Sequence, residues 1–88
     1  MNTTTVGTRE EIFEDLKKII NDTFKINTEN LDIATKLFNG GLSLNSIQLI
    51  ELTVAIENFY DKQLATELLT EENFQDIITL AEVIKNNF

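Results

Sequence analysis

The chain of 88 residues is long enough for one small domain, in which about two-thirds of the surface of the unfolded chain can be buried. It contains no cysteine and no histidine, which excludes disulfide bridges, thiolate metal ligands and the usual histidine base of hydrolases. Fifteen acidic residues against seven basic ones give a net charge of -8, which argues against nucleic acid or an anionic membrane as partner and favours basic proteins. No apolar run is long enough to span a membrane and the N-terminus has no secretion signal, so we expect a cytoplasmic protein.

The first seven residues are polar and aperiodic, and we expect a disordered lead-in at 1–7 ahead of one domain at 8–88. A helix is predicted at 9–24. Thr8 and Glu11 have the spacing of a capping box, in which each side chain accepts a hydrogen bond from the backbone of the other residue. The apolar side chains of this helix fall on one arc at the helical period. They are Ile12, Phe13, Leu16, Ile19, Ile20 and Phe24.

Residues 25–44 lose this period, and so long a connection in a small domain needs a reason. We expect its apolar side chains to hold it across the helices, with a short helical turn near residues 35–38. Gly40 and Gly41 provide the backbone freedom for a sharp approach to the next helix. The side chains expected to anchor the connection are Leu31, Ile33, Leu37, Phe38, Leu42 and Leu44.

The second helix is predicted to begin at Ser46. Asn45 has a short side-chain oxygen suited to an N-cap, and Gln48 stands three residues later, where a capping box needs glutamate or glutamine. The hydroxyl of Ser46 then lies beside unpaired backbone N–H groups and the positive end of the helix dipole. That position suits a negatively charged group, so Ser46 is a candidate site for attachment of a phosphodiester.

This helix carries two apolar stripes, which fall on opposite sides when its residues are placed about 100° apart. One stripe is wide enough to face the core. The outer stripe is flanked by Glu51 and Glu57 and should remain partly exposed, which is typical of a binding surface. The alternative is that the long first connection covers it. The core stripe contains Leu49, Leu52, Ile56, Phe59 and Tyr60, and the outer stripe contains Ile47, Ile50 and Val54.

The pattern is interrupted again at residues 61–65, where Leu64 is the expected inward anchor. A short third helix of about one turn is predicted at residues 71–74, capped by Thr70 and ending before Asp76. So brief a helix is marginal without tertiary support.

The last helix is predicted to begin near Thr79, whose spacing to Glu82 fits another capping box, and Lys85 should meet the negative end of its dipole. The elements together predict an all-α fold: a small bundle of three main helices plus one short helix, with a long first loop. The C-terminal side chains expected in its core are Phe74, Ile77, Ile78, Leu80, Val83 and Ile84.

The residues around Ser46 resemble the attachment motif of the acyl carrier proteins and their peptidyl and D-alanyl relatives. That motif is Asp-Ser followed by leucine or isoleucine, with Glu-Leu five and six residues after the serine and a hydrophobic-Glu pair at ten and eleven. Asn45 stands in the position of the aspartate, which keeps the cap but removes a negative charge. The matching pairs here are Ser46-Ile47, Glu51-Leu52 and Ile56-Glu57.

This resemblance implies a carrier and not an enzyme, with 4′-phosphopantetheine attached to Ser46. On that arm, acyl or aminoacyl groups would be held as thioesters in fatty-acid, polyketide or related biosynthesis. The implied partners are a phosphopantetheinyl transferase and acyl- or aminoacyl-transferring enzymes with basic docking patches, and a monomer is expected. The residues expected to contact these partners are Asn45, Ile47, Ile50, Glu51, Val54 and Glu57.

Ser43 offers a competing attachment site, because residues 40–44 resemble the Gly-Gly-His-Ser-Leu motif of peptidyl carriers with leucine in place of histidine. Counted from Ser43, however, the fifth and sixth residues are Gln48 and Leu49, and the glutamate pairs fall out of step. The spacing therefore favours Ser46.

A second hypothesis belongs to a different class of protein: a helical interaction or regulatory module that keeps the carrier fold but never receives the arm. The asparagine at position 45 is its main support. A small enzyme or metal-binding protein has little support, since the sequence contains no pairing of nucleophile and base and no calcium-binding loop.

Overall fold

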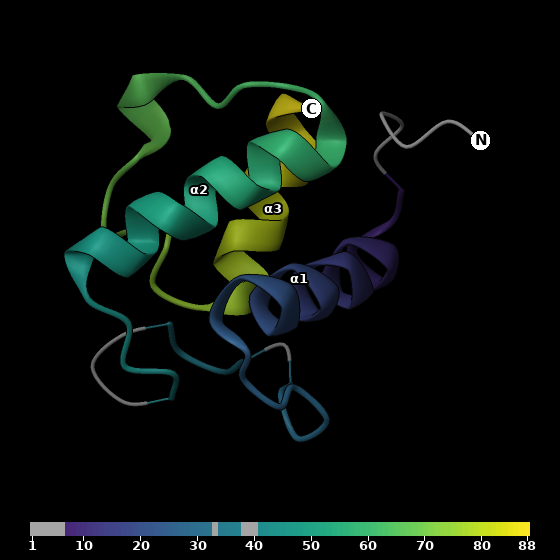
Figure 1. Cartoon of the computed structure of the whole chain (residues 1–88). Helices are drawn as coiled ribbons and strands as arrows, with labels where there is room; N and C mark the ends of the chain where they lie inside the picture. Colours follow the sequence, from purple (N-terminus) through teal and green to yellow (C-terminus); the bar gives the residue numbers. More distant parts are fainter. Residues whose placement is uncertain (1–6, 33, 38–40) are drawn as a thin grey trace.

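The computed structural model describes residues 7–32, 34–37 and 41–88, and it contains three α-helices joined by long connections (Figure 1). They are α1 (Arg9–Phe24), α2 (Ser46–Tyr60) and α3 (Ile77–Asn87), and a short 3₁₀ helix, η1 (Thr66–Leu68), lies between α2 and α3. No β-strand occurs in these described ranges, and α1 contacts both α2 and α3. The predicted all-α fold is confirmed. Residues 1–6 of the expected lead-in lie outside the described residues.

α1 has the bounds that its local signals predicted. The Thr8 hydroxyl accepts a hydrogen bond from the Glu11 backbone at 3.3 Å, and the Glu11 carboxylate accepts one from the Thr8 backbone at 2.8 Å. The helix ends where Lys25 takes a left-handed conformation with φ of 58°, a common way to close a helix. Its predicted apolar arc faces the core: Ile12, Leu16, Ile19 and Ile20 are buried, and Phe13 and Phe24 are half-buried against them.

The core lies where α1 meets α2 and α3. The predicted core stripe of α2 faces inward, since Leu52, Ile56 and Tyr60 are buried and Leu49 and Phe59 are half-buried at its edge. From the C-terminal part, the buried side chains are Phe74, Ile77, Leu80, Ala81, Val83 and Ile84.

In the first connection, residues 25–45, buried leucine side chains anchor the chain to the core. Leu37 and Leu44 are buried as predicted, and the Leu44 N–H donates to the Leu37 carbonyl at 2.7 Å. The Leu37 N–H donates to the Gln75 carbonyl at 3.0 Å, so its buried backbone has a partner in the second connection. Ile33 and Phe38, predicted as further anchors, lie outside the described residues.

The helical turn predicted near residues 35–38 is wrong for the part that the structure describes. Lys36 forms an isolated antiparallel bridge with Asp76, and the Ile77 N–H donates to the Thr35 carbonyl at 3.1 Å. Pairing with a neighbouring segment satisfies these backbone groups better than one isolated turn could. Gly41 then turns the chain with φ of 54°, and a Cβ atom there would collide with the Lys36 carbonyl, so this position requires glycine.

The short helix predicted at residues 71–74 is a single capped turn, and the second connection contains a 3₁₀ helix that was not predicted. The regular element is η1, whereas residues 71–74 form a single turn in which the Phe74 N–H lies 3.2 Å from the Thr70 carbonyl. Thr70 does cap that turn, since its hydroxyl accepts from the Asn73 N–H at 3.2 Å. One turn gains too few hydrogen bonds to continue as a helix, and the chain leaves it to pair at Asp76.

α3 begins at Ile77 and not near Thr79, so the predicted capping box of Thr79 and Glu82 is wrong. The Asp76 carboxylate is the cap and accepts a hydrogen bond from the Thr79 N–H at 2.9 Å. Glu82 instead forms an ion pair with Arg9 at 2.6 Å, between α3 and the start of α1. Both caps were locally possible, and the bridge at Asp76 together with the complete burial of Ile77 favours the earlier start.

Tyr60 closes α2 against α1. Its ring is buried, and its hydroxyl donates to the Asp15 carboxylate at 2.9 Å. Burial, followed by the hydrogen bond and the charge of Asp15, raises the pKa of Tyr60 above its ordinary value. The folded protein therefore holds this proton more tightly than the unfolded chain does.

We expect Tyr60→Phe to lower the free energy of unfolding by about 1.5 kcal/mol, because the charged Asp15 carboxylate loses its hydrogen bond from the Tyr60 hydroxyl. With a raised folded-state pKa, the contribution of Tyr60 is complete below the ordinary tyrosine pKa of about 10 and is lost as the pH rises above it. Urea unfolding of both proteins from neutral to alkaline pH measures the two effects. Since Tyr60 is the single tyrosine of the chain, tyrosinate absorbance follows its ionisation directly. Ionisation of Tyr60 in the folded protein near the ordinary tyrosine pKa of about 10 would contradict the expectation.

Candidate functional site

The N-terminus of α2 is built by a reciprocal cap. The Asn45 side-chain oxygen accepts from the Gln48 N–H at 2.8 Å, and the Gln48 side-chain oxygen accepts from the Asn45 N–H at 2.9 Å. The predicted capping box is confirmed, and Ser46 is the first residue of the helix. Ser46 is exposed, and the cap does not need its hydroxyl, which is therefore available for covalent chemistry.

The charge around this helix end differs from that at the other two helices. α1 carries Glu10 and Glu11 in its first turn, and α3 is capped by Asp76. The first turn of α2 has no acidic residue, and its cap is the neutral Asn45. The positive end of the α2 dipole is thus left without a carboxylate of its own, and a phosphodiester on the Ser46 hydroxyl would fit that charge.

Ser43, the competing candidate, lies before the cap and not on the helix. Its backbone has φ of 54°, in the left-handed region that residues other than glycine adopt at a cost. The neighbouring Leu44 is buried and bonded through its backbone to Leu37, which fixes this stretch against the core. The two serines therefore have different surroundings, and only Ser46 lies at the helix terminus.

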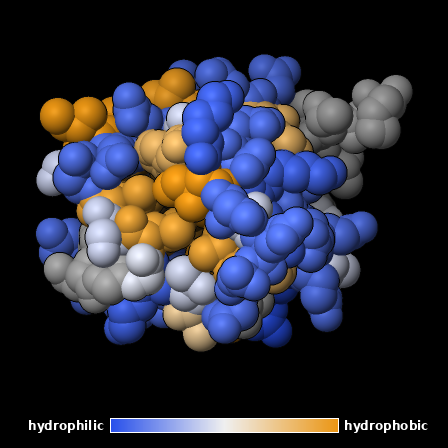
Figure 2. Space-filling view, turned by 60° about the horizontal axis from the view of Figure 1, so that its bottom comes forward, coloured by the Kyte–Doolittle hydropathy of each residue, from blue (hydrophilic) through white to orange (hydrophobic). Residues whose placement is uncertain are grey.

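The outer stripe of α2 is exposed. Ile47 is 70% exposed, Ile50 64% and Val54 49%, and Glu51 beside them is exposed as well. The described residues of the first connection do not cover this stripe. Figure 2 shows hydrophobic side chains gathered on one face of the molecule and bordered by hydrophilic ones.

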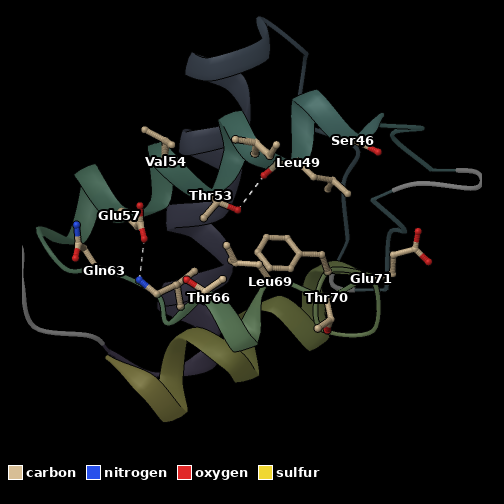
Figure 3. A pocket seen from close by; sticks show the side chains of 13 residues that line it. Ser46, Leu49, Thr53, Val54, Glu57, Gln63, Thr66, Leu69, Thr70 and Glu71 are labelled. Atoms are coloured by element: carbon tan, nitrogen blue, oxygen red, sulfur yellow. Dashed lines mark hydrogen bonds between the residues drawn. The ribbon is translucent and has the colours of Figure 1, made fainter.

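An open groove of about 520 Å³ lies between α2 and the second connection, and sequence reasoning did not find it. Ser46 lies toward one end, and Glu57 and Gln63 lie toward the other (Figure 3). Thr53 could have indicated this groove, because it is a small side chain among large ones on α2. Its hydroxyl donates a hydrogen bond to the Leu49 carbonyl at 2.9 Å. The apolar lining consists of Leu49, Ile50, Val54, Leu64, Leu69 and Phe74.

Glu57, expected at the rim of a docking surface, is partly turned into the protein. It is half-buried, and its Oε2 atom accepts a hydrogen bond from the Leu64 N–H at 2.8 Å, drawn as a dashed line in Figure 3. The remaining predicted contact residues are exposed, four of them on α2 and one at its N-cap. The structure therefore groups Ile47, Ile50, Glu51 and Val54 along one exposed side of α2, with Glu57 at its inner edge, and Asn45 is exposed separately at the N-cap.

Neither a membrane-spanning helix nor a cluster of metal ligands occurs among the residues that the structure describes. Among them, no helix has the length and apolar character needed to cross a membrane. In the same ranges no group of three or more acidic side chains is arranged to hold a metal ion.

Comparison with known proteins bears on the same region. Residues 14–84 match the model of a family described as "Phosphopantetheine attachment site". The chain is also 29% identical over 75 residues to a protein of Coprothermobacter proteolyticus named "Acyl carrier protein", an alignment that covers 84% of this chain and 90% of that protein. The matched stretch includes α2, the groove and most of α1 and α3.

Proposed function

This chain belongs to the acyl carrier protein family, and on that premise we propose that Ser46 is the residue to which its 4′-phosphopantetheine is attached. Members of this family are carriers and not catalysts, so the protein is a carrier and not an enzyme. The observation that supports Ser46 is its position: an exposed hydroxyl on the first residue of α2, beside the reciprocal cap of Asn45 and Gln48. The negative charge of the phosphodiester would be stabilised by the positive end of the helix dipole, and its oxygens could accept hydrogen bonds from the free N–H groups of the first turn.

The attached group supplies what the chain lacks, a thiol, which can hold an acyl group as a thioester. The protein's own residues position and shelter that group. Asn45 and Gln48 hold the helix end in one conformation, so the point of attachment is fixed relative to the groove. The groove begins beside Ser46, and an arm attached there can turn into it.

We infer that the cargo is an apolar acyl group, as in fatty-acid, polyketide or related biosynthesis. The support is the lining of the groove, where Leu49, Leu69 and Phe74 offer aliphatic and aromatic surface. Burying an apolar chain against such walls is favourable by about 25 cal/mol for each Å² removed from water. A charged aminoacyl group would lose its hydration there, which makes the aminoacyl alternative less favourable.

As a carrier, the protein works with transferases and acyl-handling enzymes. We propose that these partners dock on the exposed side of α2 as basic proteins, with the carrier acting as a monomer. Ile47, Ile50 and Val54 would provide the apolar centre and Glu51 the charge, while Asn45 would be read next to the attachment site. Docking there would bring the arm on Ser46 to the partner's active site.

An interaction module that never receives the arm remains the second hypothesis, because Asn45 replaces the aspartate of the family motif. Intact-mass measurement separates the two hypotheses. After incubation with coenzyme A and a broad-specificity transferase, we expect the mass to increase by one phosphopantetheinyl unit. An unchanged mass with several transferases would favour the interaction module.

We expect Asn45→Asp to be modified faster than the natural protein. The substitution restores the charge of the family motif. A carboxylate at the cap of α2, whose first turn has no acidic residue, should also stabilise the helix by about 0.3–1 kcal/mol. Modification rates and urea unfolding of the two proteins measure the effects separately. A stabilised variant that is modified more slowly would show that its transferase reads the asparagine itself.

A further inference from the structure

Glu57 holds the start of the second connection to the last turns of α2. Its backbone carbonyl accepts from the Lys62 N–H at 3.1 Å, and its carboxylate accepts from the Leu64 N–H at 2.8 Å. The chain reverses at Asp61, just before these two contacted residues, with a left-handed φ of 54°. One residue of α2 therefore holds two residues of the segment that follows this reversal.

The carboxylate contact lies at the end of the groove that is farther from Ser46. Glu57 and Leu64 both line the groove, and Glu57 is eleven residues after Ser46 in the same helix, or about 16 Å along its axis. The Leu64 side chain is buried, so the carboxylate fixes the backbone of a residue that forms the wall. Figure 3 shows Ser46 and Glu57 at opposite ends of the lining residues.

We propose that Glu57 is a specificity-determining residue: by holding Leu64 against α2 it closes the far end of the groove and sets the length of acyl chain that the groove can shelter. This inference rests on the proposed function, in which the groove receives a chain attached at Ser46. A buried backbone N–H needs an acceptor, and a carboxylate is a stronger acceptor than a neutral oxygen. Without it, Leu64 loses the bond that keeps this wall in place.

The reach of the side chain and its charge can be separated by substitution. Glu57→Asp keeps the charge but shortens the side chain, so that its oxygen no longer reaches the Leu64 N–H. Glu57→Gln removes the charge but keeps an oxygen at the same reach. A contact that closes the groove predicts that the Asp variant behaves like Glu57→Ala and the Gln variant like the natural protein. A role of Glu57 as a docking charge predicts the reverse order.

The experiment uses the protein carrying arms acylated with saturated chains of increasing length, each confirmed by intact mass. In the natural protein the melting temperature should rise with chain length and then level off when the groove is full, because a bound chain stabilises only the folded state. In Glu57→Asp and Glu57→Ala the levelling should move to longer chains, and in Glu57→Gln it should stay near the natural length. Glu72→Ala, an exposed carboxylate outside the groove, is the matched control and should leave the levelling unchanged.

Amide exchange at Leu64, measured on the same proteins without a chain, reports the contact itself. We expect about tenfold faster exchange in Glu57→Asp and Glu57→Ala than in the natural protein and in Glu57→Gln. Unchanged exchange, or faster exchange with no change in the length at which stabilisation levels off, would overturn the proposal. If Glu57→Ala does not fold, Glu57→Asp carries the comparison.

Failure of the underlying function would look different, since it would be visible before any substitution. A natural protein that takes no arm, or whose melting temperature ignores every chain, removes the premise and overturns this inference with it. A natural protein that responds to chain length while the Asp and Ala variants respond identically overturns the role of Glu57 alone.

Discussion

Ser46→Ala is expected to abolish attachment of the phosphopantetheinyl unit, while Ser43→Ala is modified as the natural protein is. The reason lies at the α2 N-terminus, where Ser46 is exposed on the first helical residue and Ser43 lies before the cap. The loss should be complete and not partial, because the hydroxyl is the acceptor of the transferred group. Intact mass after incubation with coenzyme A and transferase gives the answer for each variant.

The same substitution should leave the fold intact. The helix is capped by Asn45 and Gln48 without help from the Ser46 hydroxyl, so Ser46→Ala should change the free energy of unfolding by no more than about 0.5 kcal/mol. Urea unfolding provides this control, which is needed because an unfolded variant would also remain unmodified. A modified Ser46→Ala, or an unmodified Ser43→Ala that is fully folded, would move the attachment site to the other serine.

Val54→Asp and Glu51→Lys are expected to weaken binding of the transferase and of acyl-handling partners by about tenfold or more, since Val54 belongs to the apolar centre of the proposed surface and Glu51 is the charge beside it. Val54 is 49% exposed and Glu51 is exposed, so neither change should cost more than about 1 kcal/mol of stability. The charge reversal should also flatten the dependence of binding on salt, because a carboxylate that attracts basic side chains is lost. Binding constants at several salt concentrations measure both effects.

Ile47→Asp is the matched variant for this surface. Val54 also lines the groove, so a change there could act through the cargo, whereas Ile47 is 70% exposed and is not part of the groove lining. Weaker binding in both variants places the effect on the outer stripe. If Val54→Asp unfolds the protein and Glu51→Lys leaves every binding constant unchanged, the recognition surface lies elsewhere.

The features that sequence reasoning predicted correctly depend on residues close together in the chain. The capping box of Thr8 and Glu11 and that of Asn45 and Gln48 span three residues each, and they determine where α1 and α2 begin. The two stripes of α2 follow from helical periodicity, and the exposed one contains Ile47, as predicted. The position of Ser46 on the first turn of α2 could therefore be predicted without the structure.

What the tertiary structure decided depends on segments distant in sequence. Asp76 and Thr79 were both possible caps, and the bridge between Lys36 and Asp76 favours the earlier start of α3. The same pairing replaced the helical turn that local pattern suggested in the first connection. Such choices are made by backbone hydrogen bonds between connections, which no periodicity encodes.

The groove and the inward turn of Glu57 also depend on segments that are distant in sequence. A cavity exists only when two walls meet, and here one wall is α2 and the other is the stretch around Leu64 and Leu69. The sequence placed Glu57 correctly on the flank of the helix, but it could not show that the chain returns to offer the Leu64 N–H to its carboxylate. By itself, the sequence determined the helix that presents Ser46, because caps and stripes are local. The space beside that serine was decided by the fold, because it requires the second connection to lie against α2.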